Sequence, residues 1–489
     1  MAATELFHTD DRHDDAYEIV IGMEVHAQLR TKSKLFCGCS TDSWDAPPNS
    51  HTCPVCLAMP GTLPVINREA VAQTIRAGLA LNCTIATEAV FARKNYTYPD
   101  LPKGYQISQY ELPLCRNGWL EIDTPTGPRR IRITRAHLEE DTGKLVHDGQ
   151  VSLVDLNRAG VPLLEIVSEP DLRSVEEVNE YLSRLRQVLM YIGVNSGDLE
   201  KGHMRMEANV SLRPHGSESL GTKVEIKNLN SFRAVRNALE YEIERQRRIL
   251  ATGGQVEQVT LGWLETAGRT YVQRSKESAH DYRYFPEPDL PPLVIEPAWV
   301  DELRRTLPEL PLARRDRFQR DYGLSRYDAE VLVADRNVAD FFEQVAATTM
   351  AEVKTTANWV MGELFRLMNQ TGKTLAEVPV TPAAFAGLLD LVARGVINAN
   401  TGKRVFETMF RTGETAEAIV AREGLAQVSD VEVLAQAVQR VLAAHPQEVE
   451  RYRQGKTQLL SWFIGQVMRE TRGKANPDIV RRMLEERLK

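Results

Sequence analysis

The most informative stretch of the N-terminal half of the chain is Tyr17–Leu29, YEIVIGMEVHAQL. Apolar residues occupy every second position along it: Ile19, Ile21, Met23, Val25, Ala27 and Leu29. Because successive side chains of a strand point to opposite faces, the stretch predicts one strand with a buried face and a polar face. Glu24, His26 and Gln28 lie on the polar face. A carboxylate and an imidazole two residues apart on a rigid strand form half of a metal or proton-transfer site, and a solvated strand face is the alternative.

Polar faces of the same kind are predicted for later strands. In Gly202–Arg213 apolar residues alternate without a break with polar ones, which are His203, Arg205, Glu207, Asn209 and Ser211. The next stretch repeats the pattern with Lys223, Glu225 and Lys227. The segment His137–Asp141, HLEED, follows the alternating run Arg130–Thr134 and adds three carboxylates. Several such strands side by side predict a charged groove that holds a cation, and a solvated sheet face is again the alternative.

Pattern and length together predict an α+β protein of two or three domains. A chain of 489 residues is too long for one ordinary core. Strand patterns with a few interrupting helices, and without a regular βαβ rhythm, precede the proline-rich passage 285–292, and helical patterns follow it. We expect these parts: a leader at 1–16, a mixed or antiparallel sheet domain at 17–296, an all-α domain at 297–413 and a small helical tail at 414–489.

Three helices are predicted inside the sheet domain from their start signals. Asn67, Ser174 and Ser231 are typical N-cap residues, and each precedes apolar residues at helical spacing. Ser174 with Glu177 has the spacing of a capping box, in which the two side chains bond reciprocally to the backbone of the first turn.

Composition and charge narrow the class of protein. Net charge is −7, which argues against wholesale coating by nucleic acid. In residues 450–489, however, Lys and Arg outnumber Asp and Glu two to one. This excess predicts an anionic partner for the tail, and solvated helix faces are the alternative. No apolar run approaches the length of a membrane span, and the acidic leader lacks the apolar core of a signal peptide, so we expect a cytoplasmic protein.

Four of the six cysteines form two short pairs joined by a polar loop: Cys37, Cys39, Cys53 and Cys56. This spacing is typical of a zinc site with four thiolate ligands, which leaves no open position and is therefore structural. Unligated or redox-active cysteines are the alternative, and disulfides are disfavoured in a reducing cytosol. Cys83 and Cys115 stand alone and are expected to pack in the core.

The segment Arg93–Gln109 has the composition of a binding loop. Two X-Pro steps and a glycine predict a loop, in which Lys94 and Lys103 offer charges for phosphate. Three tyrosines offer faces for stacking: Tyr96, Tyr98 and Tyr105. No P-loop and no G-x-G-x-x-G fingerprint occurs anywhere in the chain, so the sequence does not locate an adenine pocket.

Several long motifs, in order, resemble one known family, the B subunits of the tRNA-dependent aspartyl/glutamyl amidotransferases. The motifs are Gly22–His26, Lys94–Gln109, Arg135–Asp141, Val154–Arg158, Glu165–Asp171, Lys227–Phe232 and Asp281–Asp289. The resemblance covers essentially everything after Tyr17. It implies ATP-dependent conversion of glutamate on tRNA(Gln), or aspartate on tRNA(Asn), into the amide.

The resemblance further implies a cradle-shaped catalytic domain and a heterotrimeric assembly. In that heterotrimer an amidase (glutaminase) is the A subunit, which releases ammonia from glutamine, and a small third protein is the C subunit. The chain has no Gly/Ser-rich amidase nucleophile segment, which fits that division of labour.

Matching the family motifs residue by residue implies roles for the polar positions. Glu24, His26 and Glu140 match a magnesium site, with Glu139 and Glu207 as lesser candidates. Three residues match positions near the end of an ammonia tunnel and are expected to be catalytic: Lys94, Lys103 and Glu140. Magnesium and lysines would neutralise the charge of a transferring phosphoryl group.

The resemblance also strengthens the prediction that the tail binds tRNA. Six basic residues are expected to contact phosphates: Lys456, Arg469, Arg472, Lys474, Arg481 and Arg482. A non-catalytic tRNA-binding scaffold of the same complex is the alternative function. The carboxylates of the predicted sheet and the Lys/Tyr loop argue against it, because a scaffold needs neither.

Overall fold

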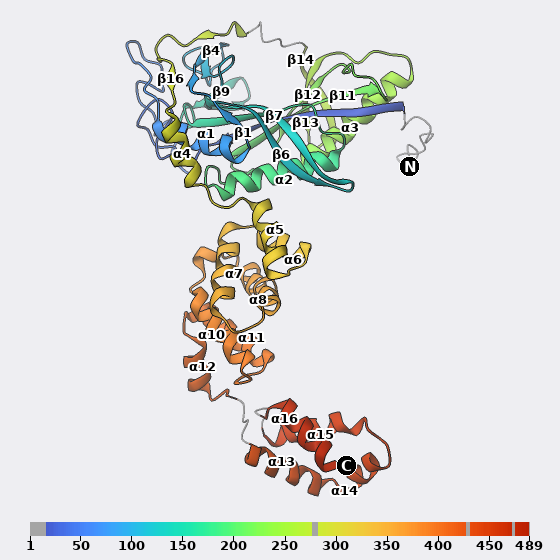
Figure 1. Ribbon diagram of the computed structural model, residues 1–489. Helices are drawn as coiled ribbons and strands as arrows, with labels where there is room; N and C mark the ends of the chain where they lie inside the picture. The colour runs from blue at the N-terminus through green and yellow to red at the C-terminus, as the bar shows by residue number, and fades with distance from the viewer. Residues whose placement is uncertain (1–15, 276–281, 427–430, 472–474, 489) are drawn as a thin grey trace. The chain divides into compact units, whose positions relative to one another are not determined.

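A computed structural model of the chain describes residues 16–275, 282–426, 431–471 and 475–488 (Figure 1). Contacts divide the chain into two compact units, Met1–Leu310 and Pro311–Lys489. The first unit is built on β-sheets and the second is helical, so the predicted α+β class is confirmed. The predicted leader lies, except for Ala16, outside the described residues.

A nine-stranded sheet forms the centre of the first unit, in the order β14-β13-β12-β11-β1-β10-β7-β6-β2. Its strands are β1 Tyr17–Gln28, β2 Thr84–Ile85, β6 Cys115–Thr124, β7 Gly127–Glu140, β10 Pro162–Ser168, β11 Met204–Pro214, β12 Val224–Leu229, β13 Val259–Leu264 and β14 Arg269–Ser275. Neighbouring strands are antiparallel except β12 and β13, which are parallel. Parallel neighbours need a crossover connection, and the helix Phe232–Ala251 provides it between β12 and β13.

Three helices cover one face of this sheet, where Figure 1 shows α1 and α2 beneath it. They are α1 Arg68–Ala80, α2 Val175–Tyr191 and α3 Phe232–Ala251. Asn67, Ser174 and Ser231 cap them as predicted. Only one bond of the predicted capping box is present, the one in which Ser174 Oγ accepts from the Glu177 backbone. The Glu177 carboxylate accepts from the backbone N–H of Arg173 instead of that of Ser174.

The core between the helices and the sheet contains the apolar face of β1. Ile21, Met23, Val25 and Ala27 are at most 1% exposed, so the predicted alternation is confirmed. The corresponding positions of β11, from Met204 to Val210, are buried in the same core. The opposite faces of these strands are therefore left to polar side chains.

A second, three-stranded sheet in the order β15-β4-β5 packs against β7. Its strands are β4 Ala92–Asn95, β5 Tyr105–Ser108 and β15 Phe285–Pro286. The prediction that Arg93–Gln109 is a loop is therefore wrong at both ends, because the two ends pair as a hairpin. Both prolines of the segment lie in the connection between β4 and β5, together with Tyr96 and Tyr98, whereas Tyr105 is the first residue of β5. The proline-rich passage 285–292 supplies the third strand of this sheet.

Smaller elements complete the first unit. They are the pair β3 Glu88–Ala89 and β16 Leu293–Val294, the hairpin β8 Lys144–Asp148 and β9 Val151–Asp155, and the helix α4 Pro297–Arg305. Leu303 of α4 is buried in the core of this unit. The division by contacts counts residues 297–310 with the first unit, whereas the predicted domain boundary lies at 296.

The second unit consists, in its described residues, of helices and turns. The helices are α5 Pro311–Tyr322, α6 Arg326–Leu332, α7 Arg336–Thr348, α8 Val353–Trp359, α9 Phe365–Thr371, α10 Pro382–Ala393, α11 Ala399–Thr412, α12 Ala416–Glu423, α13 Val431–Ala444, α14 Pro446–Arg453, α15 Leu459–Glu470 and α16 Pro477–Leu488. A π-helical turn, Val360–Leu364, joins α8 to α9. Two separate apolar clusters, within 318–420 and within 434–488, form its cores. The division into three domains at 296 and 413 stays a prediction.

None of the described helices combines the length and the apolar character that crossing a bilayer would need.

Candidate functional site

Four adjacent strands of the large sheet place a row of ionisable residues on its polar face. His26 of β1 lies opposite Glu165 of β10 on one side and opposite Arg205 of β11 on the other. Glu165 in turn lies opposite His137 of β7. Because directly opposed residues of antiparallel strands share a face, the row follows from the register alone.

The carboxylates gather around the imidazole of His26. The His26 Nε2 atom lies 3.4 Å from Glu165 Oε2, 3.6 Å from Glu139 Oε1 and 3.7 Å from Glu24 Oε1. The Glu139 side chain is only 3% exposed and that of Glu165 7%. Glu24 lies opposite Glu207 of β11, which extends the cluster across a further strand.

Crowding of buried carboxylates shifts the pKa values of the cluster. Burial, reinforced by the charge of Glu165, raises the pKa of Glu24 and that of Glu139 to about 7. Burial opposes the charge on His26, but the hydrogen bond and charge of Glu165 and the charges of Glu139 and Glu24 raise its pKa to about 9. Burial also disfavours the charge on Glu165, yet its basic neighbours hold its pKa well below the usual range.

Lysine and arginine side chains neutralise part of this negative charge. Lys227 of β12 places its Nζ atom 2.9 Å from Glu207 and 3.5 Å from Glu225. Arg135 lies 3.5 Å from Glu165. Burial disfavours the charge on Lys94, but the negative charge of Glu139 raises its pKa well above the usual range. Lys94 therefore stays an ammonium beside the cluster.

The donor atoms fit a hard divalent cation. Three sets each hold their ligand atoms within 4.8 Å of one another: Glu24/His26/Glu165, His137/Glu139/Glu165 and Glu24/Glu207/Glu225. In octahedral Mg²⁺ coordination, neighbouring ligands are about 3 Å apart and opposite ligands about 4 Å apart. The His26–carboxylate distances of 3.4–3.7 Å fall between these values. Carboxylate oxygens are also the atoms that such an ion prefers. Neutral imidazole would serve as a ligand, so a bound cation would displace the His26 proton.

Glu140, expected beside Glu24 and His26, points elsewhere. Its Oε1 atom accepts from the Ile107 backbone at 2.9 Å, and Lys103 Nζ lies 2.7 Å away. No group of possible ligands in the described residues includes it. The reason is that β7 continues to Glu140, so Glu139 takes the charged face and Glu140 the other. The structure brings Lys103 to Glu140, whereas Lys94 lies beside Glu139 and Glu165.

A cavity of about 200 Å³ adjoins the Lys103–Glu140 pair. Its lining includes both residues of the pair, together with Cys37 and Cys56. It also includes Lys34, whose fully buried ammonium donates to two backbone carbonyls. Two cysteines of the cluster and the Lys103–Glu140 pair therefore line the same cavity.

The four paired cysteines converge as the spacing predicted. Their Sγ atoms all lie within 4.8 Å of one another, and those of Cys53 and Cys56 are 3.8 Å apart. A tetrahedral zinc with Zn–S bonds of about 2.3 Å places its sulfur ligands about 3.8 Å apart. A hydrogen bond from Cys37 lowers the pKa of Cys56, which favours the thiolate form that a zinc ligand requires. Cys83 and Cys115 are buried in the core.

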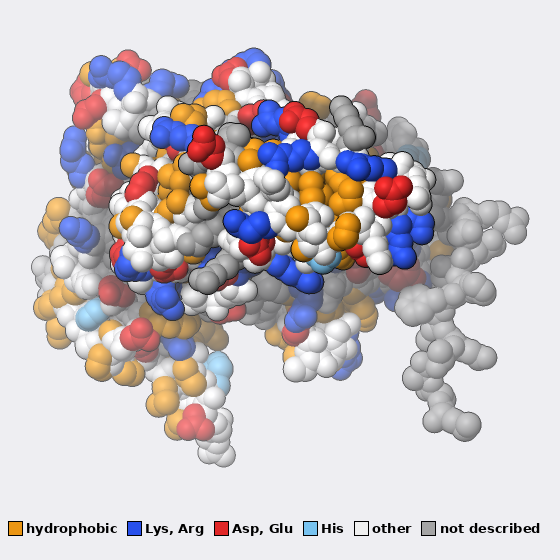
Figure 2. Space-filling view, turned by 90° about the horizontal axis from the view of Figure 1, so that it is seen from below, with side chains coloured by type: hydrophobic (Ala, Val, Ile, Leu, Met, Phe, Trp, Pro, Cys, Tyr) orange, Lys and Arg blue, Asp and Glu red, His pale blue; other side chains and the backbone are white. Residues whose placement is uncertain are grey.

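The basic residues of the tail are exposed wherever the structure describes them. These are Lys456, Arg469, Arg481 and Arg482. Arg472 and Lys474 lie outside the described residues. On the face that Figure 2 shows, Lys and Arg side chains lie among Asp and Glu instead of forming one uninterrupted patch.

Sequence reasoning missed the central carboxylate of the cluster. Glu165 is the only charged residue of strand Pro162–Ser168, PLLEIVS, and a single charge inside an apolar strand was the available signal. His137 and Glu225 were seen on polar segments, but the sequence did not show that they approach Glu165 and Glu24.

Comparisons with known proteins cover nearly the whole chain. Residues 19–301 match the GatB/GatE catalytic domain, and residues 340–488 match the GatB domain. The B subunit of the aspartyl/glutamyl-tRNA(Asn/Gln) amidotransferase from Thermodesulfovibrio yellowstonii is 53% identical over 96% of this chain and 98% of its own length. The protein of the same name from Geobacter sulfurreducens is 53% identical over 97% of this chain and 99% of its own length. The chain therefore belongs to the family of aspartyl/glutamyl-tRNA(Asn/Gln) amidotransferase B subunits.

Proposed function

We propose that the chain carries out the ATP-dependent amidation of glutamate on tRNA(Gln), of aspartate on tRNA(Asn), or of both. The side-chain carboxylate attacks the γ-phosphorus of ATP, ADP leaves, and an acyl phosphate forms. Ammonia then attacks the acyl carbon, and inorganic phosphate leaves as the amide forms. The observation that carries this proposal is the cluster of Glu24, His26, Glu139 and Glu165, with Lys94 beside it. Catalysis of phosphoryl transfer consists mainly of positioning and charge neutralisation, which this cluster suits.

Glu24, His26, Glu139 and Glu165 would hold a magnesium ion, with Glu207 at the edge of the cluster. Bound there, the ion would neutralise the phosphate oxygens of the nucleotide. Lys94 would add a fixed positive charge on the same side. The carboxylates would hold the ion at one place on a rigid sheet, and residues of β1, β7 and β10 would thereby position the reacting phosphate.

Lys103 and Glu140 would act on ammonia, because they form a buried ion pair beside a cavity on another side of β7. Ammonia must lose a proton to the surroundings as it becomes an amide, and Glu140 can accept one while Lys103 balances its charge. The cysteine cluster would bind a structural zinc ion that holds one wall of this cavity.

The chain would work as the B subunit of a cytoplasmic heterotrimer. An amidase, the A subunit, would release ammonia from glutamine, and a small C subunit would complete the assembly. The exposed basic residues of the tail would contact the phosphates of tRNA, which supply affinity without reading sequence.

The decisive experiment measures the purified complex with Glu24→Gln in this chain. We expect ATP-dependent phosphorylation of the aminoacyl-tRNA to fall at least tenfold at a fixed magnesium concentration, because a ligand of the ion loses its negative charge. Glutamine hydrolysis by the partner should remain. The matched control is Glu218→Gln, an exposed glutamate outside the cluster. Unchanged ATP turnover in Glu24→Gln would favour the non-catalytic scaffold instead.

A further inference from the structure

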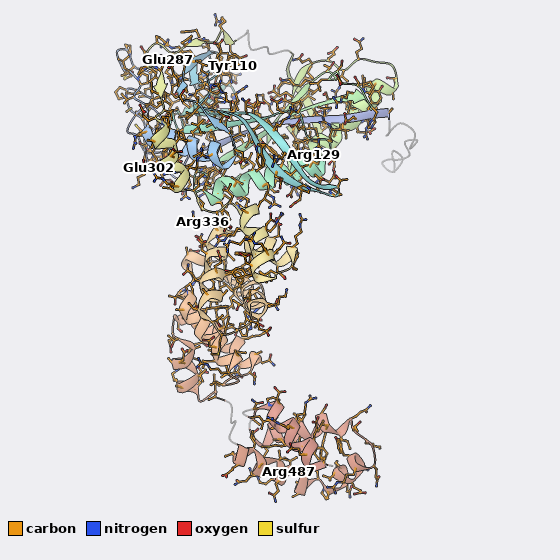
Figure 3. All side chains as sticks on the ribbon, in the orientation of Figure 1. Tyr110, Arg129, Glu287, Glu302, Arg336 and Arg487 are labelled. Atoms are coloured by element: carbon orange, nitrogen blue, oxygen red, sulfur yellow. The ribbon has the colours of Figure 1, made fainter. Side chains whose placement is uncertain are left out.

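Four tyrosines from three segments meet on the polar side of the large sheet. Tyr96 follows β4, Tyr110 follows β5, and Tyr282 with Tyr284 precedes β15. The rings of Tyr110 and Tyr284 are stacked, with centroids 4.3 Å apart and planes within 8° of parallel. Tyr282 packs edge-on against Tyr96 and against Tyr284. Figure 3 labels Tyr110 on the side of the large sheet opposite α1 and α2.

The inner end of this aromatic group adjoins the carboxylate cluster. Lys94 Nζ lies 4.8 Å from the centroid of the Tyr282 ring. Burial raises the pKa of Tyr284 to about 12, and the charges of Lys94, Glu165 and Glu139 also act on its hydroxyl group. The hydroxyl of Tyr284 therefore lies within electrostatic reach of the proposed phosphate site.

The outer end is open to solvent. Tyr110 remains 38% exposed although its ring is stacked on Tyr284. A parallel pair of rings with an exposed outer member can be extended by a third flat ring, and nucleobases stack on tyrosine in this way. The stack thus offers a place for a base at the rim of a site whose interior suits phosphate.

We infer that Tyr110, supported from behind by Tyr284, stacks the adenine of a substrate. The inference rests on the proposed function, which supplies two sources of adenine: ATP and the terminal adenosine of tRNA. In both cases the base lies outermost and the reacting groups extend inward, past Lys94, to the carboxylate cluster. Because stacking uses the ring face, the tyrosine hydroxyl is dispensable at Tyr110.

The first test measures equilibrium binding to the purified complex carrying Tyr110→Ala, Tyr110→Phe or Tyr110→Trp. The probes are a non-hydrolysable ATP analogue and inorganic tripolyphosphate, which lacks a base. For adenine supplied by ATP, we expect Tyr110→Ala to bind the analogue roughly 5- to 100-fold more weakly and tripolyphosphate equally well. Tyr110→Phe and Tyr110→Trp should bind both probes like the unmodified protein. Tyr327→Ala, which removes a 75% exposed tyrosine of α6, is the control.

The second test distinguishes the source of the adenine. If tRNA supplies it, Tyr110→Ala leaves the binding of the ATP analogue unchanged. The variant instead has a higher KM for misacylated tRNA that ends in adenosine. It also no longer prefers this tRNA to a misacylated tRNA that ends in cytidine. The inference is overturned if Tyr110→Ala changes neither the affinity for the ATP analogue nor KM for misacylated tRNA. It is also overturned if Tyr110→Phe weakens binding as much as Tyr110→Ala does. Failure of the proposed function would look different, since the unmodified complex would then lack ATP-dependent amidation altogether.

Discussion

Glu139 and Glu140 are consecutive in the chain, yet their carboxylates lie on opposite sides of β7. The Glu139 carboxylate lies 3.6 Å from His26 Nε2, within the cluster on the large sheet. The Glu140 carboxylate lies 2.7 Å from Lys103 Nζ, beside the cavity that Cys37 and Cys56 also line. Consecutive residues of a strand point to opposite faces. Two neighbouring residues of β7 therefore contribute to two different sites, one suited to phosphate and the other to proton transfer.

Amide substitutions at these two positions should therefore have different effects. We expect Glu139→Gln to raise the magnesium concentration for half-maximal ATP turnover at least tenfold, because a buried ligand loses its charge. Glu140→Gln should keep the magnesium dependence but lower amide formation per ATP consumed. The measurement follows ADP and amidated tRNA in the same reaction across a magnesium titration. Each variant is the control for the other, and identical magnesium profiles would contradict the assignment.

The sequence predicted the parts of the fold that depend on local periodicity. The alternation in Tyr17–Leu29 is enough to place Glu24 and His26 on one face, because a strand has only two faces. Asn67 and Ser231 predict helix starts because their side chains cap the first turn. The cysteine spacing likewise predicts the four-sulfur cluster, since both pairs lie in one short segment.

The sequence could not supply what depends on register and on strand ends. Matching the family motif ranks Glu140 ahead of Glu139 as a magnesium ligand, and the motif does not show which face of the strand each carboxylate takes, although a shift of one residue changes that face. Glu165 was missed because only the pairing of β10 with β1 places it opposite His26. Helix α4 was assigned to the helical part because its pattern is helical, and only contacts show that Leu303 packs in the first core.

Removal of one cysteine sulfur should empty the cysteine cluster of metal. We expect Cys56→Ser to abolish the one equivalent of zinc that the unmodified chain would carry, because three thiolates bind zinc far more weakly than four. The first unit should also unfold at a lower temperature, since binding energy contributes to folding. Metal content is measured by mass spectrometry and unfolding by calorimetry. Cys83→Ala, which removes a core thiol, should retain zinc, and a chain that contains no zinc before mutation would refute the prediction.

Charge reversal in the tail should weaken tRNA binding in a salt-dependent way. We expect Arg481→Glu combined with Arg482→Glu to reduce affinity and to lower the slope of log Kd against log salt by about 1.5 to 2, as two phosphate contacts are lost. Binding of labelled tRNA to the complex is measured at several salt concentrations. The matched control is Arg304→Glu combined with Arg305→Glu on α4, another exposed pair of adjacent arginines. An equal effect of the two double variants would count against a specific role of the tail.

The carboxylate of Glu343 on α7 should make the helical unit sensitive to acid. It lies 2.6 Å from Arg317, accepts from the Tyr322 hydroxyl at 3.2 Å and pairs with Arg314, whose side chain is 6% exposed. Burial disfavours its charge, but the hydrogen bonds and charges of Arg317 and Arg314 lower its pKa. A folded-state pKa below the unfolded value of about 4.3 stabilises the fold above that pH, and this stabilisation is lost as pH falls. We expect Glu343→Gln to destabilise the helical unit at pH 7 by about 1 to 3 kcal/mol, with the difference shrinking below about pH 4.

Hydrogen exchange of α5 and α7 peptides, measured across a urea series at several pH values, reports this difference for the helical unit alone. Glu414→Gln is the matched control, because the carboxylate of Glu414 pairs with Arg422 on the surface. Exposed pairs are screened by water and contribute little, so the control should show no resolvable change. A constant difference between Glu343→Gln and the unmodified chain from pH 7 to pH 3 would mean that packing, and not charge, accounts for the effect. A difference that closes with acid assigns it to the ionised carboxylate held between Arg314 and Arg317.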